Sequence, residues 1–407
     1  MRMDQEKVFL ADTADYEKDT VFNSVKYLFD SLGGAESIVG RNKNVFLKVN
    51  LVREMTPDKC GTTHPSVVEA IAKILINETG AKVRVGDSSG SAYNAPVMNS
   101  TFRTCGMAGA CAASGAVLID DFGSTTKKID GKVVRYLDII DEFNNADVVI
   151  NVGKLKTHSF TRYTGAVKNL YGLIPGLVKA QTHSLYPTLS VFCDCLIDIE
   201  RFASQKIVLH FIDAVIGMEG DGPTNGTPKF IGKIIASKNP YYADVAGVSL
   251  FADPTQMPLI KKAQERGLLP DDLTETGIDF AALNKDYVSD FKTVTVVDSD
   301  FTKKGFLRRF LRKNWVTRRP VINTKKCKGC GRCYAHCPQK AIDMVGKTTP
   351  KKAKIRKNEC IRCACCQELC PHNAVKLKKP ILYRVICALN YNGKKRSKRN
   401  GKEQKTD

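Results

Sequence analysis

The chain has 407 residues, 15 cysteines and a formal net charge of +21 at pH 7. Its length exceeds what one ordinary hydrophobic core occupies, so we expect at least two domains. No apolar run approaches the roughly 18 residues that a membrane span needs, and the charged N-terminal stretch lacks the apolar core of a signal peptide. We therefore expect no transmembrane segment and a location in the reducing cytoplasm.

The first 300 residues alternate between strand-like and helix-like segments. In chain order we expect strands at 45–50, 82–87, 116–120, 147–152, 207–213, 229–236 and 292–297, and helices at 64–80, 96–113, 185–204, 241–251 and 257–266. This alternation predicts an α/β domain with a mostly parallel sheet and helices on both faces.

The C-terminal part contains two runs of four cysteines with the spacing C-x2-C-x2-C-x3-C, each followed by proline. In this bacterial ferredoxin spacing, the fourth cysteine of each run binds the cluster of the other run. The sequence therefore predicts two 4Fe–4S clusters, one on Cys327, Cys330, Cys333 and Cys370 and the other on Cys360, Cys363, Cys366 and Cys337. Zinc is the alternative for an isolated C-x2-C pair, but a zinc site ends at four ligands in two pairs.

The positive charge is concentrated around these runs. Residues 301–407 hold 31 Lys and Arg against 5 Asp and Glu, whereas residues 1–300 hold 32 against 37. A basic electron-transfer module attracts acidic partners or anionic surfaces. We therefore expect an acidic redox partner protein.

Four segments are expected along the chain. An α/β domain occupies 1–300, a basic amphipathic linker helix 301–319, an α+β domain of the bacterial ferredoxin type 320–378, and a short amphipathic segment with a disordered basic tail 379–407. The apolar half of the linker can dock on the larger domain or lie on a membrane surface. We favour docking.

Polar residues follow several predicted strands, where ligands bind in open parallel sheets. The candidates for a ligand pocket are Lys48, Asn50, Ser88, Ser89, Asp213 and Glu219, with Glu219 expected in a flexible loop. The candidates for catalysis are His64, Asp87, Lys154, Lys156, His158 and Lys168. Each has a structural alternative: His64 can cap a helix, Asp87 can satisfy turn amides, and Lys154 and Lys156 can form a solvated edge.

Residues 151–193 contain no Asp or Glu but five Lys or Arg and two His. A lysine-rich segment with glycines suits a loop around a carboxylate or phosphate, so we expect a small anionic ligand. No G-x-G-x-x-G follows a strand and no G-x-x-x-x-G-K-[ST] occurs, so the common nucleotide motifs lack support. The sequence identifies no further organic cofactor. Cys193 and Cys195 are expected in the core, and Cys365 lies outside the ligand register.

An ordered set of motifs resembles a known family. The motifs are KVN (48–50), THP (63–65), GDSSG (86–90), GKLKTH (153–158), TGAVKNLYGLIPG (164–176) and GMEGDGP (217–223). Together they resemble prokaryotic domain-of-unknown-function family 362, which is often fused to a bacterial-type ferredoxin module. The resemblance implies a redox-linked function but supplies no substrate. A more distant resemblance links the domain to the N-terminal part of the lactate racemase family, from which no cofactor is carried over.

Three functions follow in order of preference. The first is an oxidoreductase in which the clusters exchange electrons with an anionic substrate or cofactor in the α/β domain. The alternative is a non-enzymatic ferredoxin-type carrier whose large domain is a docking platform for a partner. Attachment to nucleic acid or a membrane through the basic tail ranks third, because aromatic residues are scarce there.

Overall fold

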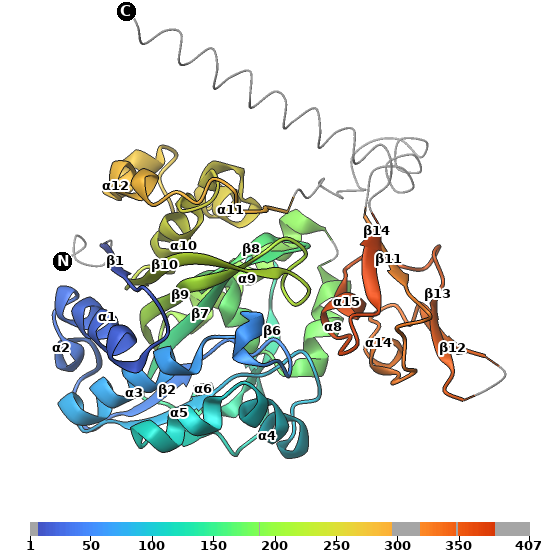
Figure 1. The fold of residues 1–407 in the computed structure, drawn as a ribbon, viewed down its shortest axis with the longest axis horizontal. Coiled ribbons are helices and arrows are strands. Elements are labelled where there is room, and N and C mark those ends of the chain that lie inside the picture. Colours follow the sequence, from blue (N-terminus) through green and yellow to red (C-terminus); the bar gives the residue numbers. More distant parts are fainter. Residues whose placement is uncertain (1–6, 187, 295–317, 347–348, 379–407) are drawn as a thin grey trace, which may run out of the picture. The chain divides into compact units, whose positions relative to one another are not determined.

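The computed structural model describes residues 7–186, 188–294, 318–346 and 349–378. The chain divides into two compact units, Met1–Val294 and Thr295–Asp407 (Figure 1). Each unit is described by itself below. The expected linker helix lies almost entirely outside the described residues, as does the whole of the expected C-terminal segment.

The first unit is built on an eight-stranded sheet with the order β1-β10-β9-β7-β2-β3-β4, in which β8 pairs with β7. The strands are β1 Val8–Asp12, β2 Asn44–Lys48, β3 Lys82–Gly86, β4 Val117–Leu118, β7 Val148–His158, β8 Arg162–Thr164, β9 Ile207–Glu219 and β10 Thr227–Ser237. Strands β9, β7, β2, β3 and β4 are parallel, whereas β10, β1 and β8 pair antiparallel with their neighbours. The expected mostly parallel sheet is confirmed. A separate two-stranded ribbon joins β5 (Ser124–Lys128) to β6 (Tyr136–Ile140).

Helices cover both faces of this sheet, as expected (Figure 1). One layer includes α1, α3 and α5, which pack on each other, and the opposite layer includes α7, α9, α10 and α11. The helices of the unit are α1 Lys18–Ser31, α2 Ala35–Val39, α3 Pro65–Thr79, α4 Ala95–Thr104, α5 Met107–Ser114, α6 Asp141–Asn145, α7 Ala166–Asn169, α8 Gly176–Leu185, α9 Leu189–Ala203, α10 Pro240–Ser249, α11 Pro258–Glu265 and α12 Phe280–Lys285. Short 3₁₀ turns are η2 Pro57–Lys59, η3 Leu170–Leu173, η4 Pro254–Gln256 and η5 Leu273–Thr276.

The chain order of the parallel strands places a topological switch between β2 and β7. From β2 the chain builds outward to β3 and β4 on one side, and it later builds β7 and β9 on the other side. Connections therefore leave the carboxyl ends of β2 and β7 in opposite directions. In open α/β sheets such a point forms a crevice in which ligands bind.

Helix α3, which follows β2, begins and ends for local reasons. His64 caps its first turn by accepting a hydrogen bond from the Ser66 amide, and Pro65 occupies the first helical position. Proline suits that position because its missing N–H would have no partner there. Gly80 ends the helix in the left-handed conformation that glycine adopts readily.

Several elements differ from the sequence predictions. The helix expected at 96–113 is two helices, because Gly106 adopts a left-handed conformation between α4 and α5. Strand β7 continues to His158, and β9 continues beyond a register shift to Glu219. Glu219 therefore ends a strand, and its placement in a flexible loop was wrong.

Two of the predicted strands also need correction. The strand expected at 116–120 is shortened to β4. Residues 292–294 of the strand expected at 292–297 are not extended in a sheet, and the remainder lies outside the described residues.

The second unit consists of two similar halves. Its elements are β11 Arg319–Ile322, α14 Arg332–Ala335, β12 Ile342–Val345, β13 Lys352–Ile355, α15 Cys365–Glu368 and β14 Val375–Lys378. Strand β11 pairs antiparallel with β14, and β12 pairs antiparallel with β13. Each half thus contributes one strand, a short helix carrying part of a cysteine run, and a second strand.

Truncating a side chain buried in the central strands should lower the free energy of unfolding much more than truncating an exposed one. Phe211 on β9 is fully buried against Phe29, whereas Phe230 on β10 is 55% exposed. We expect Phe211→Ala to lower the free energy of unfolding by about 3–5 kcal/mol because it leaves a cavity. The control Phe230→Ala should change it by about 0.5 kcal/mol or less. Chemical denaturation followed by far-ultraviolet circular dichroism measures both, and equal effects would contradict the described core.

Candidate functional site

A buried ion pair lies at the switch point between β2 and β7. The Lys48 ammonium is 2.8 Å from Asp87 Oδ1, and both side chains are almost completely buried. Lys48 Nζ also donates to the carbonyl oxygens of Val49 and Asn169, at 2.8 and 2.6 Å. Asp87 accepts from the amides of Leu51 and Ser88. Burial lowers the Lys48 pKa, and the Asp87 charge opposes that change.

An asparagine chain extends this pair across the sheet. Asn169 accepts from Asn50 Nδ2 at 2.8 Å and donates to Asn151 Oδ1 at 2.8 Å. Asn50 Oδ1 in turn accepts from Lys156 Nζ at 2.6 Å. Lys156 also donates to the Gly61 carbonyl at 2.6 Å. The loop after β2, the strand β7 and the last residue of α7 are therefore joined by side-chain hydrogen bonds.

A second buried group lies where β7 meets β9. Lys154 Nζ lies 2.8 Å from Asp213 Oδ2 and donates to the Tyr16 hydroxyl at 2.7 Å. The Tyr16 hydroxyl donates to Asp213 Oδ1, also at 2.7 Å. The His64 ring stacks on the Tyr16 ring with centroids 3.6 Å apart. The phenol thus lies between a cation and a carboxylate, with an imidazole on its face.

The protonation of this second group follows from its burial. Burial lowers the pKa of His64 to about 4, opposed by the Asp213 charge and reinforced by the Lys154 charge. The imidazole is therefore neutral near pH 7, and its Nδ1 accepts from the Ser66 amide. Burial and the Asp213 charge raise the pKa of Tyr16. The hydroxyl is consequently protonated and suited to donate rather than lose a proton.

A third group lies beside the loop after β3. Lys179 on α8 donates to the carbonyl oxygens of Ser88 and Ser89 and lies 3.3 Å from Ser88 Oγ. Burial lowers its pKa to about 7, with the charges of Lys48 and Lys168 acting in the same direction and that of Asp87 opposing. Because Ser88 directly follows Asp87 in the chain, the third group lies next to the Lys48–Asp87 pair.

Lys168 and His183 lie in an aromatic setting. The Lys168 ammonium lies over the Tyr171 and Phe192 rings at 5.2 and 5.6 Å from their centroids. His183 stacks on Phe192 at 4.5 Å, and burial lowers its pKa to about 3, so its ring is neutral. Two neutral histidines therefore accompany the lysines of these groups.

The three groups and Lys168 are together called the lysine cluster. It is defined by five lysines and two aspartates: Lys48, Lys154, Lys156, Lys168, Lys179, Asp87 and Asp213. Removing ammonium groups from water costs several kcal/mol each unless charge or hydrogen bonds compensate. The excess of lysines over aspartates favours the binding of an anion.

Most of the sequence candidates meet in or beside this cluster. Lys48, Asn50 and Lys156 are joined directly or through Asn169, and Lys154, Asp213 and His64 are joined directly or through Tyr16. Ser88 and Ser89 contact Lys179. The solvated-edge alternative for Lys154 and Lys156 was wrong, because each is 1% exposed. His64 and Asp87 fit both the structural alternative and the site prediction. Each makes its structural hydrogen bonds and also lies in or beside the cluster.

Two candidates have other surroundings. His158 Nδ1 accepts from the amides of Phe160 and Thr161 and so closes the turn between β7 and β8. Glu219 binds the amide and ammonium of Lys292. Their proposed roles stay predictions.

Sequence reasoning missed Tyr16, Asn151 and Asn169. Asn169 lies within the acid-free segment and follows Lys168, so that segment already pointed to its position. Tyr16 precedes α1, more than 130 residues from Lys154 in the chain. No sequence pattern marks it, because only the antiparallel addition of β1 to the sheet edge brings it to the site.

Thiols of both cysteine runs lie near one another in the second unit. The Cys333 pKa is raised to about 11 by burial and then by the charges of Cys370, Cys327 and Cys330. The Cys366 pKa is raised by burial and then by the charges of Cys363, Cys360, Cys333 and Cys337. The division of the eight cysteines into two ligand sets stays a prediction.

Among the described residues, no three His, Cys, Asp or Glu side chains converge on the position of one metal ion. Cys365 is buried and hydrogen-bonded to Cys363.

Two family models match the chain. A model described as a domain of unknown function (DUF362) matches residues 45–249, and a model described as a 4Fe–4S dicluster domain matches residues 326–374. The first match contains the strands and loops of the lysine cluster. The second contains both cysteine runs.

Three curated relatives are each similar to a part of the chain. A thylakoid-associated protein from Synechocystis sp. is 30% identical over 267 residues, 65% of this chain and 80% of that protein. A pyruvate synthase subunit PorD from Methanothermobacter marburgensis is 31% identical over 75 residues, 18% of this chain and 84% of the subunit. An uncharacterised ferredoxin from Methanocaldococcus jannaschii is 33% identical over 58 residues, 14% of this chain and 75% of that protein.

Solved structures give a weaker likeness. The lactate racemase apoprotein from Thermoanaerobacterium thermosaccharolyticum aligns at 12% identity and a TM-score of 0.38, over 59% of this chain and 56% of that chain. A protein from Thermotoga maritima aligns at 11% identity and a TM-score of 0.36, over 58% of this chain and 59% of that chain. The α/β fold is assigned from the strand order and not from these alignments.

No helix in the described ranges has the length and hydropathy that crossing a membrane requires. The match to a 4Fe–4S dicluster domain and the similarity to iron–sulfur proteins support an iron–sulfur electron-transfer module in the second unit.

Because the lysine cluster is closely packed, adding one methyl group there should change the free energy of unfolding. A Cβ at Gly172 would collide with the Asp87 carboxylate and the Lys48 ammonium, whereas a Cβ at Gly109 meets nothing within 4 Å. We expect Gly172→Ala to lower the free energy of unfolding by about 1–3 kcal/mol. Gly109→Ala, inside α5, should raise it by about 0.5–1 kcal/mol. Equilibrium denaturation compares the two, and a neutral Gly172→Ala variant would contradict the described pair.

Proposed function

The chain belongs to the DUF362 family and carries a 4Fe–4S dicluster domain, and from this premise we propose that it is an iron–sulfur oxidoreductase. In this proposal the second unit holds two 4Fe–4S clusters, and the first unit binds a small anionic substrate or cofactor. Electrons pass between the clusters and that ligand. The excess of buried lysines at the switch point carries the proposal.

The ligand sets proposed for the clusters follow the crossed cysteine pattern. One set is Cys327, Cys330, Cys333 and Cys370, and the other is Cys360, Cys363, Cys366 and Cys337. Burial of Cys327, Cys366 and Cys370 in the small hydrophobic core supports these assignments, because an apolar shell controls solvent access to a cluster. When bound, 4Fe–4S clusters supply one-electron transfer.

The lysine cluster is proposed as the anion site. Lys48 and Lys154 already have carboxylate partners, whereas Lys179 interacts with the neutral oxygens of Ser88 and Ser89. An anionic ligand near Lys179 would offset the cost of burying that ammonium. The position also matches the crevice at which open α/β sheets bind ligands.

Tyr16 is proposed as a positioning residue for the ligand site. Its hydroxyl accepts a hydrogen bond from the Lys154 ammonium and donates one to the Asp213 carboxylate, so it holds both charged groups in place. His64, neutral and stacked on the same ring, is the candidate for proton transfer, as its sequence position suggested.

A ferredoxin-type carrier remains the alternative function. The similarity of the second unit to PorD subunits favours it, because those proteins are named as subunits of pyruvate synthase. In this alternative the first unit is a docking platform and binds no substrate. The cytoplasmic location stays a prediction, and a thylakoid-associated relative gives membrane association as its competitor.

Adjacent cysteines provide a matched test of the clusters. We expect anaerobically purified protein to contain about eight irons per chain, as two cubanes require. Cys366→Ala should lose about four of them and the corresponding absorbance and electron paramagnetic resonance signals. The neighbouring Cys365→Ala, outside the proposed sets, should retain all eight. An iron content unchanged by Cys366→Ala, or no iron at all, would refute the cluster assignment.

The pKa of Lys179 predicts a pH-dependent anion site. Because that pKa is lowered to about 7, the ammonium is charged below pH 7 and neutral above it. Inorganic phosphate or succinate should therefore raise the melting temperature by several degrees at pH 6 and by about half as much or less at pH 8.

A variant of Lys179 and a matched control distinguish the enzyme proposal from the carrier alternative. Lys179→Met should abolish this pH dependence, while Lys73→Met, a part-exposed lysine paired with Glu69, should preserve it. Differential scanning calorimetry measures both. A wild-type protein that gains no stability from any small mono- or dianion would favour the carrier.

A further inference from the structure

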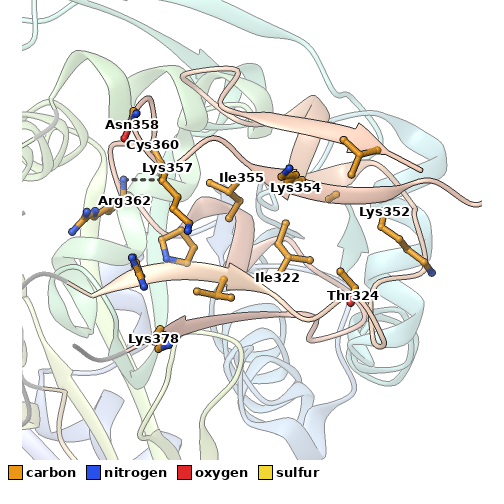
Figure 2. Close-up of a pocket in the computed structure, with 15 residues that line it drawn as sticks. Ile322, Thr324, Lys352, Lys354, Ile355, Lys357, Asn358, Cys360, Arg362 and Lys378 are labelled. Carbon is orange, nitrogen blue, oxygen red and sulfur yellow. Dashed lines mark hydrogen bonds between the residues drawn. The ribbon is translucent and has the colours of Figure 1, made fainter. Parts of the chain in front are cut away.

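A groove of about 1120 Å³ crosses the second unit, and the electron-transfer proposal assigns it no role. Its walls include all four residues of β11 and all four of β13 (Figure 2). Because alternate side chains of a strand point to opposite faces, a lining that includes every residue indicates a groove along the strand edges. Among the described strands, β11 pairs with β14 and β13 with β12, so each keeps one edge toward the groove.

The groove walls are basic. They carry Arg319, Lys352, Lys354, Lys357, Arg362 and Lys378, and no Asp or Glu is among the lining residues. Lys354, Lys357 and Lys378 are exposed. A concave surface lined by one sign of charge concentrates the electric field and attracts molecules of the opposite sign.

The floor of the groove is apolar. Ile322 and Ile355 lie in its middle, and Figure 2 shows the basic side chains around them. Val321 and Val345 also line it and are 42% and 40% exposed, which makes them two of the most exposed aliphatic side chains described in this unit. An apolar centre with a charged rim is the composition of a protein–protein interface.

One end of the groove reaches a proposed cluster ligand. Cys360 is among the lining residues, and Lys357 and Arg362 stand beside it (Figure 2). The Cys360 side chain is part-exposed, unlike the buried Cys366 and Cys370. A partner seated in the groove would therefore approach the cluster proposed on Cys360, Cys363, Cys366 and Cys337.

We propose that this groove is the docking surface for an acidic electron-transfer protein, which exchanges electrons at its Cys360 end. The proposal rests on the proposed cluster function and adds the place and charge of the partner. Charge complementarity selects a protein of acidic surface. The chain's own C-terminal segment, residues 379–407, holds nine Lys and Arg against two Asp and Glu and does not complement the groove. The apolar floor favours a protein over a nucleic acid.

Charge reversal at the Cys360 end tests the groove in the full chain. The variant Lys357→Glu/Lys378→Glu is compared with Lys325→Glu/Lys328→Glu, which changes the same charge at exposed lysines outside the lining. Stopped-flow absorbance follows cluster reduction by the hydroquinone of an acidic flavodoxin. The methyl viologen radical cation, a small reductant, serves as a second electron donor. The milder Lys357→Gln/Lys378→Gln guards against a folding effect.

At low ionic strength the groove variant should lose at least about tenfold in the second-order rate constant with flavodoxin, and the glutamine variant a smaller factor. The control pair should stay within about twofold of wild type. The wild-type rate should fall with salt, and that dependence should weaken in the groove variant.

Other outcomes overturn the proposal. They are a groove variant that reacts with flavodoxin at the wild-type rate, a control variant that loses as much, or a wild-type protein that flavodoxin does not reduce. Iron content and viologen reduction test the cluster function separately. A protein that lacks iron refutes the proposed function, whereas intact iron and viologen kinetics with no groove effect refute only the docking surface.

Discussion

The structure of the first unit depends on how it compensates buried ammonium groups at the carboxyl edge of its sheet. Lys48 and Lys154 are each paired with an aspartate, and Lys156 donates to oxygens of Asn50 and Gly61. Because desolvation of an unpaired charge costs several kcal/mol, the loops that supply these acceptors have little freedom to move. The same constraint leaves positive charge in excess at the point where an α/β sheet binds ligands.

The two units divide the proposed chemistry between them. The first unit provides positive charge, a protonated phenol and neutral imidazoles in a buried setting. These groups can bind an anion and move protons, but none of them carries electrons. The second unit provides the thiols of an iron–sulfur module and few acidic groups. The proposed electron exchange with an anionic ligand uses both sets.

The charge asymmetry of the chain has a structural counterpart in the groove. Lysine and arginine side chains there surround exposed aliphatic residues. An acidic partner would therefore meet both its complementary charge and the part-exposed Cys360 at one place.

The sequence by itself determined the spacing of the two cysteine runs, the α/β class and most residues of the lysine cluster, because spacing and strand exits are local properties. Lys48, Asp87 and Lys154 were all found at strand ends. Tyr16 and the extension of β9 to Glu219 were not, because they depend on strand pairing between distant segments. Only the tertiary structure decided that Lys154 and Lys156 are buried and that β11 and β13 face a common groove, since burial and edge geometry arise when separate elements pack together.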